Sequence, residues 1–198
     1  MTKIYLLLFA FAMQARASDT PMPVVFNFSP SAQTSGPDQS VVGFRANVFY
    51  GENKSVYGAD LSIGVANTKE TFAGASLAGL VNITGKQAYV AGLQLAGLAN
   101  VNRSKANVFG FQVAGLLNSI NDEGSVYGVQ LAALANYAPK TNIHGLQLGL
   151  FNKAQTVVGL QIGLLNFTDN LHGIQIGVLN FYNRGLLGVT PILNIGFL

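Results

Sequence analysis

The chain has no cysteine and no tryptophan, and only 10% of its 198 residues are charged. The absence of cysteine excludes disulfide bonds and a lipid-modified cysteine. Ordinary soluble domains carry about 25% charged residues, so this chain is unusually poor in charge. Its few Lys and Arg residues do not cluster, which excludes the basic footprint of a nucleic-acid-binding protein.

Long apolar runs are also missing. Beyond residue 17, no stretch approaches the roughly 20 apolar residues that a transmembrane helix needs. Mean hydropathy is nevertheless +0.37, and 23 residues are Gly. A secreted, apolar, glycine-rich chain without such a helix indicates either β-strands that face lipid or a stacked β-repeat.

Residues 1–17 have the pattern of a secretory signal peptide. Lys3 forms a short positive segment, Ile4 to Met13 is apolar, and the run Ala15-Arg16-Ala17 is a cleavage site of the A-x-A type. Cleavage would remove Lys3 and Arg16 and leave nine Lys/Arg against eight Asp/Glu, a net charge of +1. The basic character of the whole chain is therefore not a property of the mature protein.

A repeat occupies most of the remaining chain. Residues 18–40 form an irregular leader with four prolines and one short predicted strand at Val24–Phe28, and residues 41–198 form the repeat domain. Its phrase, Gly-Leu-Gln-Ile-Gly-Leu-Leu-Asn at 159–166, recurs with small changes every 14–18 residues. The phrase alternates in period two, which predicts a β-strand, and turn-forming clusters that hold most of the charges separate successive phrases. The first glycines of the phrases, called the phrase glycines below, are Gly43, Gly58, Gly74, Gly92, Gly110, Gly128, Gly145, Gly159, Gly173 and Gly188.

The residue two positions after each phrase glycine is polar in ten consecutive repeats. Its neighbours on the same strand face are mainly Gly and Ala, whereas the opposite face carries Leu, Ile and Val. This pattern predicts a polar series in the interior of the fold, in which the first two members lie on adjacent strands and can pair. The series, which is our candidate site, is Arg45, Asp60, Ser76, Gln94, Gln112, Gln130, Gln147, Gln161, Gln175 and Thr190.

The leading interpretation is an all-β fold, an up-and-down antiparallel β-barrel of about ten strands in a bacterial outer membrane. Closure satisfies every backbone polar group, as lipid requires, while the aliphatic face meets lipid and the polar series fills the interior. An 11-residue strand such as 157–167 spans about 36 Å at ~3.3 Å per residue, enough to cross the apolar band when tilted. Aromatic residues near the strand ends fit interfacial girdles. The partners predicted are outer-membrane lipid and small solutes that pass a narrow, porin-like pore.

The alternative is a parallel β-solenoid in which each repeat forms one coil. A meander would place the Asn that ends each phrase at alternating rims, whereas a solenoid stacks it in a ladder and fills its interior with Leu and Ile. Against this, a 14-residue coil is tight, and each repeat has only one clear turn signal. The solenoid predicts a secreted or surface-attached interaction module. The residues of the Asn ladder would be Asn100, Asn118, Asn136, Asn152, Asn166 and Asn180.

Catalytic signals are weak. His144 and His172 lie two repeats apart, so about 10 Å would separate them at ~4.8 Å per strand, too far to share one metal ion. The acidic pair Asp122 and Glu123 lies in a turn, and the sequence has no nucleophile elbow and no phosphate-binding loop. We therefore predict a non-enzymatic protein with no catalytic residue, no cofactor and no metal site.

Two resemblances imply a place in the cell envelope. The repeats, most clearly at 145–180, resemble a group of bacterial surface-repeat proteins built on Gly-(Leu/Val)-Gln-(Ile/Leu)-Gly-(Leu/Val)-x-Asn. The C-terminal residues 189–198 alternate and end next to Phe197, which resembles the C-terminal signal of outer-membrane β-barrel proteins. The outer membrane is the location predicted, with secretion or the cell surface as the alternative.

Overall fold

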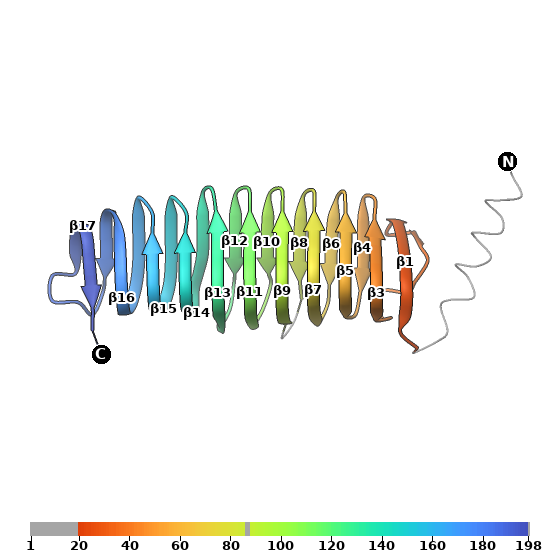
Figure 1. Ribbon diagram of the computed structural model, residues 1–198, viewed down its shortest axis with the longest axis horizontal. Coiled ribbons are helices and arrows are strands. Elements are labelled where there is room, and N and C mark those ends of the chain that lie inside the picture. The colour runs from red at the N-terminus through yellow and green to blue at the C-terminus, as the bar shows by residue number, and fades with distance from the viewer. Residues whose placement is uncertain (1–19, 86–87, 198) are drawn as a thin grey trace, which may run out of the picture.

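The computed structural model describes residues 20–85 and 88–197, which form a β-solenoid of about nine coils (Figure 1). In this described part, 17 strands form two long walls, called the front sheet and the back sheet. Strands β3, β5, β7, β9, β11 and β13 lie in the front sheet, and β4, β6, β8, β10 and β12 lie behind them (Figure 1). From β14 onward, one long strand per coil bends and contributes to both sheets. The predicted signal peptide lies outside the described residues.

The parallel pairing of the strands contradicts the predicted barrel. Each front strand pairs in parallel with the front strands of the coils before and after it. Equivalent residues of successive phrases lie side by side, so that Gly110 lies beside Gly92 and Gly128. An up-and-down barrel instead needs antiparallel neighbours. The barrel and the pore predicted from the sequence are therefore wrong, and the alternative fold, a solenoid, is correct.

Each repeat contains two strands, where the sequence predicts one, because the phrase turns in its middle. In one coil, β9 (Ala88–Ala96) ends before Gly97, and β10 (Ala99–Asn102) returns along the back sheet. This tight turn consists of Gly and Leu and lacks the polar residues that usually mark a turn. The remaining strands are β1 (Met22–Ser29), β2 (Ala32–Gln33), β3 (Val41–Asn47), β4 (Tyr50–Asn53), β5 (Val56–Ser62), β6 (Val65–Thr68), β7 (Thr71–Ala78), β8 (Val81–Thr84), β11 (Ala106–Ala114), β12 (Leu117–Ile120), β13 (Gly124–Ala132), β14 (Ala135–Leu148), β15 (Phe151–Ile162), β16 (Leu165–Tyr182) and β17 (Val189–Gly196).

The two reversals of each coil build two unlike edges of the solenoid. The Gly-Leu turns stack along one edge, at the top in Figure 1, and we call it the tight-turn edge. The polar clusters between phrases stack along the opposite edge, the charged edge. The change from 18-residue to 14-residue repeats is absorbed mainly at the charged edge, where β14, β15 and β16 run on without a loop.

The interior is lined on one level by Val, joined by Phe72, Ile143 and Leu171, and on another level by the polar series. Val90, Val108 and Val126 stack two residues before the phrase glycines and are at most 1% exposed. The Leu and Ile residues of the phrase point outward, as Leu61 and Leu77 show with about half of their surface exposed. The solenoid alternative placed Leu and Ile inside, and for those of the phrase that detail is wrong, because Gln takes the inward face of the phrase. Ile143 and Leu171, which precede phrase glycines by two residues, are buried beside Val.

Both ends of the solenoid depart from the repeat. At the N-terminal end, β1 pairs in parallel with β3 and antiparallel with the short β2. At the C-terminal end, β17 runs antiparallel to β16 and crosses from the back sheet to the front sheet. Ile192 takes a positive φ of 67° at this crossing, directly after Pro191. Among the described residues, no helix is long and apolar enough to cross a membrane.

Candidate interaction surface

The glutamines of the predicted polar series form a continuous ladder inside the solenoid. Each Nε2 donates to the Oε1 of the glutamine one coil earlier, from Gln112 to Gln94 at 2.8 Å through to Gln175 to Gln161 at 2.7 Å. These side chains are 0–3% exposed. Parallel, in-register strands place identical amides about 4.8 Å apart, the spacing at which such ladders form. The ladder provides hydrogen-bond partners for the glutamine amides, whose burial without partners would cost free energy of folding.

A second ladder of asparagines runs along the tight-turn edge. Each Nδ2 donates to the Oδ1 of the asparagine one coil later, as Asn100 does to Asn118 at 2.8 Å. The second N–H of Asn100 donates to the carbonyl oxygen of Val113 at 3.0 Å, which fixes the orientation of the amide. The asparagine ladder therefore donates toward the C-terminus, and the glutamine ladder donates toward the N-terminus. The ladder comprises Asn82, Asn100, Asn118, Asn136, Asn152, Asn166 and Asn180.

A buried ion pair heads the glutamine column at the N-terminal end. Arg45 Nε and Nη2 donate to the two carboxylate oxygens of Asp60 at 3.1 and 2.6 Å, and both residues are at most 3% exposed. Arg45 also donates to the carbonyl oxygen of Asn67 at 2.9 Å. Ser76 Oγ lies 3.1 Å from Asp60 Oδ2, between the ion pair and the first glutamine. The first three members of the polar series thus form one hydrogen-bonded network.

The last member of the predicted series does not join the ladder. Thr190 lies opposite Asn180 in the antiparallel β17, and its buried Oγ1 has no hydrogen-bond partner among the described residues. Asn194 takes the place beside Gln175 and donates to its Oε1 at 3.1 Å. The sequence did not identify Asn194 because the spacing that places Thr190 in the series assumes that the last strand runs in the same direction as the others.

The phrase glycines are needed because the coils approach one another closely at this point. The φ angle of Gly128 is 144°, a value that L side chains rarely adopt. A Cβ at Gly128 would lie 2.0 Å from the carbonyl oxygen of Gly110, one coil earlier. The same short approach recurs at every phrase glycine from Gly43 to Gly173. Glycine is therefore required at this point of each coil if the strands are to pair at the spacing at which both amide ladders form.

The outer surface of the front sheet changes in polarity from one edge to the other. Three residues before the phrase glycine lies a polar row of Ser, Thr, Asn and one Tyr. One residue before it lies a row that we call the aromatic row, in which Tyr, Phe or His stands in five coils and Val or Ala in the other four; the ring residues are Tyr57, Phe109, Tyr127, His144 and His172. One and three residues after the phrase glycine lie two aliphatic rows, which contain only Ala, Val, Leu, Ile and Phe in all nine coils from Gly43 to Gly173. Part of the aromatic row is stacked: the rings of Phe109, Tyr127 and His144 follow one another at 5.0 and 4.6 Å.

The tight-turn edge carries a column of exposed aliphatic side chains, which we call the leucine ridge. Its members are 43–60% exposed and lie directly above one another, as the backbone hydrogen bonds from Leu98 to Leu80 and from Leu116 to Leu98 show. Beyond the ridge, the nearest row of the back sheet is also apolar, from Val65 through Leu117 to Leu165, and mixed residues such as Glu52 and Lys153 follow only in the next row. The leucine ridge is Leu80, Leu98, Leu116, Leu134, Leu150, Leu164 and Val178.

Charged groups gather toward the opposite edge. Lys69 Nζ contacts Asp38 at 2.9 Å and Glu52 at 3.1 Å. Its hydrogen bond to Asp38 raises the pKa of Lys69 above its usual value. Burial pushes the pKa of Glu52 upward, but hydrogen bonds from Tyr50 and Lys69 outweigh this and hold it below its usual value. Burial, and then donation to Glu52, raises the pKa of Tyr50.

The two histidines lie in the coils before and after Val158, one on each side of it. His144 pairs in register with Val158, and Val158 pairs with His172 in the following coil. His144 stacks on Tyr127 with an interplanar angle of 8°. In the described part of the chain, no group of three or more His, Cys, Asp or Glu side chains is placed to hold a metal ion.

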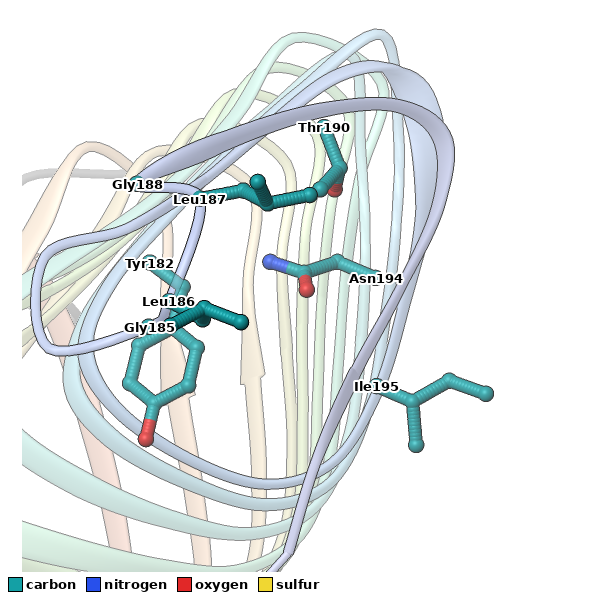
Figure 2. A pocket seen from close by; sticks show the side chains of 8 residues that line it. All are labelled: Tyr182, Gly185, Leu186, Leu187, Gly188, Thr190, Asn194 and Ile195. Carbon is teal, nitrogen blue, oxygen red and sulfur yellow. The ribbon is translucent and has the colours of Figure 1, made fainter.

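A hollow of about 190 Å³ lies at the C-terminal end, between the loop after β16 and β17 (Figure 2). Tyr182, Leu186 and Leu187 line one side and Thr190 and Asn194 the other. Figure 2 shows the side chain of Asn194 extending into the hollow, where its amide already ends the glutamine ladder. The hollow is thus a feature of the end cap.

No protein-family model matches the chain, and neither the curated proteins nor the solved structures searched gave a match.

Proposed function

We propose that the protein is a secreted or surface-attached β-solenoid that acts as a non-enzymatic interaction module of the bacterial envelope. The observation that carries the proposal is that polar side chains bond to one another inside each coil while apolar side chains occupy the outside. Gln, Asn, Arg45 and Asp60 are used in internal ladders, whereas the outside repeats the same apolar side chain coil after coil. Such a surface suits binding to an extended partner.

The location rests on the predicted signal peptide at 1–17 and on the resemblance of the repeats to bacterial surface-repeat proteins. Most polar side chains of the described interior are engaged in the two ladders or in the ion pair, which supports a binding role over catalysis. His144, for example, is stacked on an aromatic ring, and the polar head of Asn194 is bound to Gln175. The interior is filled by side chains, so the coil axis is a stabilising column and not a passage for solutes.

Fractionation of cells tests the location. We expect the full chain to leave the cytoplasm of a bacterial host, lose residues 1–17, and become accessible to protease added outside the cell or in the periplasm. A chain that begins at residue 18 is the matched control and should stay in the cytoplasm. Retention of the full chain in the cytoplasm with its first 17 residues attached would refute the proposed location.

Small-angle scattering tests the architecture on which the module depends. About nine coils at ~4.8 Å give a repeat stack about 43 Å long, elongated further by the two caps. We expect a rod-like profile for the chain that begins at residue 18. A spherical profile for the monomer would contradict the proposal.

A further inference from the structure

We propose that the partner of this module is the acyl-chain layer of a membrane, into which the leucine ridge inserts with the solenoid axis parallel to the membrane plane. This inference rests on the proposed function and adds the identity of the partner. It starts from the exposed apolar surface, because contiguous exposed apolar surface on a protein marks a site that binds a protein or a membrane. The ridge alone presents seven side chains that are each 43–60% exposed.

The apolar surface covers three sides of the molecule and not one. The aliphatic rows of the front sheet, the leucine ridge and the first row of the back sheet form a continuous belt around the tight-turn edge. A second copy that packs face to face would cover one sheet and leave the ridge and the other sheet exposed. Acyl chains are deformable and cover a convex edge on all three sides. The shape of the surface therefore favours lipid over a second copy of this chain.

The order of the rows matches the order of the layers at a membrane surface. On the front sheet, the charged edge is followed by the polar row and then by the aromatic row, where Tyr, Phe or His occupies five of the nine coils and Val or Ala the other four. The two apolar rows come next, and the ridge comes last. Tyr is favoured at the boundary between headgroups and acyl chains because its ring is apolar and its hydroxyl is polar. No charged residue interrupts the aliphatic rows in any of the nine coils from Gly43 to Gly173.

The height of the aliphatic zone fits one leaflet. Five residues separate Leu93, in the first aliphatic row, from Leu98 on the ridge, which corresponds to at most about 16 Å at ~3.3 Å per residue because the strand ends at Ala96 and the chain then turns. Half of the ~30 Å hydrocarbon core of a bilayer is about 15 Å. The ridge then reaches at most to the bilayer midplane, while the aromatic row of the front sheet stays near the headgroups and the charged edge stays in water. On the back sheet, Lys153 lies only three residues after Leu150 on the ridge, and its ammonium group would extend toward the headgroups.

The end strands are suited to this position as well. An unpaired backbone N–H is costly in acyl chains, and the open edges of a solenoid are where such groups occur. At the level of the ridge, β17 carries Pro191 opposite Leu179, and proline has no N–H. At the other end, Pro30 directly follows β1. Each terminal strand thus has a proline near the edge that would insert deepest.

The test measures binding and depth on the chain that begins at residue 18, with phosphatidylcholine vesicles as the probe. Because the chain has no Trp, single reporters can be placed as Leu116→Trp on the ridge, Tyr57→Trp in the aromatic row and Ser104→Trp at the charged edge. Vesicles brominated deep in the acyl chain should quench the ridge reporter most, and vesicles brominated near the headgroup should quench the Tyr57→Trp reporter most. The Ser104→Trp reporter should stay unquenched. Equal quenching of all three reporters, or no quenching, would overturn the proposal.

A pair of charge-matched variants separates the ridge from the rest of the surface. One carries Leu98→Asp, Leu116→Asp and Leu134→Asp; the control carries Asn107→Asp, Asn121→Asp and Gln155→Asp, all exposed and away from the ridge. Each half-exposed leucine should contribute a factor of about five to the partition coefficient, so the ridge variant should bind at least a hundredfold less. The control should bind within about threefold of the parent, and circular dichroism should show the same β-content in all three. Equal losses in both variants would refute insertion by the ridge.

Two results would exclude lipid as the partner of the apolar belt. Dimers at micromolar concentration that dissociate in the ridge variant, with no vesicle binding, would make a second copy the occupant and overturn the lipid proposal. Absence of both dimers and vesicle binding would overturn it too, yet leave the proposed location intact, because fractionation measures that independently. Anionic vesicles serve as a second arm: binding to them alone would mean that charge, and not the ridge, drives association.

Discussion

Removal of one glutamine from the ladder should destabilise the fold by an amount that depends on its neighbours. Gln130 accepts from Gln147 at 2.8 Å and donates to Gln112 at 2.9 Å, and all three are fully buried. Gln130→Leu leaves one donor and one acceptor without partners. At roughly 1–3 kcal/mol for each unsatisfied buried group, the expected loss is about 4 kcal/mol.

Pairs of substitutions test the ladder itself. Leu at both Gln112 and Gln130 still leaves only two orphaned groups, on Gln94 and Gln147, so the loss should stay near ~4 kcal/mol. Leu at both Gln112 and Gln147 leaves four orphaned groups, two of them on Gln130, and should cost about 8 kcal/mol. An adjacent pair should therefore cost about half as much as a separated pair.

Urea unfolding followed by far-ultraviolet circular dichroism measures these differences. Gln94→Leu is an internal control, because Gln94 contributes one ladder bond, to Gln112, and not two. It should destabilise the protein by about half as much as Gln130→Leu. If adjacent and separated pairs lose the same free energy of unfolding, then the amides do not act as a ladder and the reasoning fails.

Three further outcomes follow from the same structure. Gly128→Ala should abolish folding, because its Cβ would lie 2.0 Å from a backbone oxygen that the stacked coils hold in place; soluble yield and circular dichroism report this. Asp60→Asn leaves the buried charge of Arg45 without a counter-ion and should cost about 3–5 kcal/mol in thermal or urea unfolding. The pKa of Glu52 is lowered in the folded state, so its stabilising contribution is present above its unfolded pKa of 4.5 and is lost as pH falls through the folded pKa. The unfolding midpoints at pH 6 and pH 3 should therefore differ more in the parent than in Glu52→Gln.

Each of these outcomes has a matched comparison. Gly36→Ala adds a Cβ that meets no atom within 4 Å, so it should leave stability unchanged while Gly128→Ala does not. Replacing Arg45 and Asp60 together by Met and Leu should recover most of the stability that Asp60→Asn loses, since no unpaired charge remains. A parent and a Glu52→Gln variant with the same pH response would show that Lys69 and Tyr50 do not hold that carboxylate in its charged form.

The sequence predicted the strand content of this fold better than its topology. Period-two alternation around each phrase glycine identified the strands, and the recurrence of Asn100, Asn118 and their equivalents at one end of each phrase favoured a ladder. The barrel was nevertheless the leading interpretation, because only the charged clusters carried recognisable turn chemistry. The second turn, at Gly97 and Leu98, is apolar and was taken for the middle of a longer strand.

The polar series could be predicted because its period is unbroken, but the way it ends at the C-terminal cap could not be predicted. Arg45 and Asp60 were expected to pair on adjacent strands, and they do so in the solenoid, where neighbours in sequence repeats are also neighbours in space. Thr190 was placed in the series by spacing alone, but β17 reverses direction and brings Asn194 to Gln175. Strand direction depends on how the chain leaves the last coil, and no residue spacing encodes that.

The opposite directions of the two amide ladders bear on how long such a molecule can grow. A single column of aligned amides would add its dipoles coil by coil, so that each further repeat would face a larger field from those before it. Here every coil from Gln112 to Gln175 adds one glutamine amide that donates toward the N-terminus and one asparagine amide that donates toward the C-terminus, so their dipoles largely cancel. Electrostatics therefore sets no preferred number of coils. Duplication of a whole repeat would extend both ladders without altering either cap, so we expect a chain lengthened by one coil to fold in the same way.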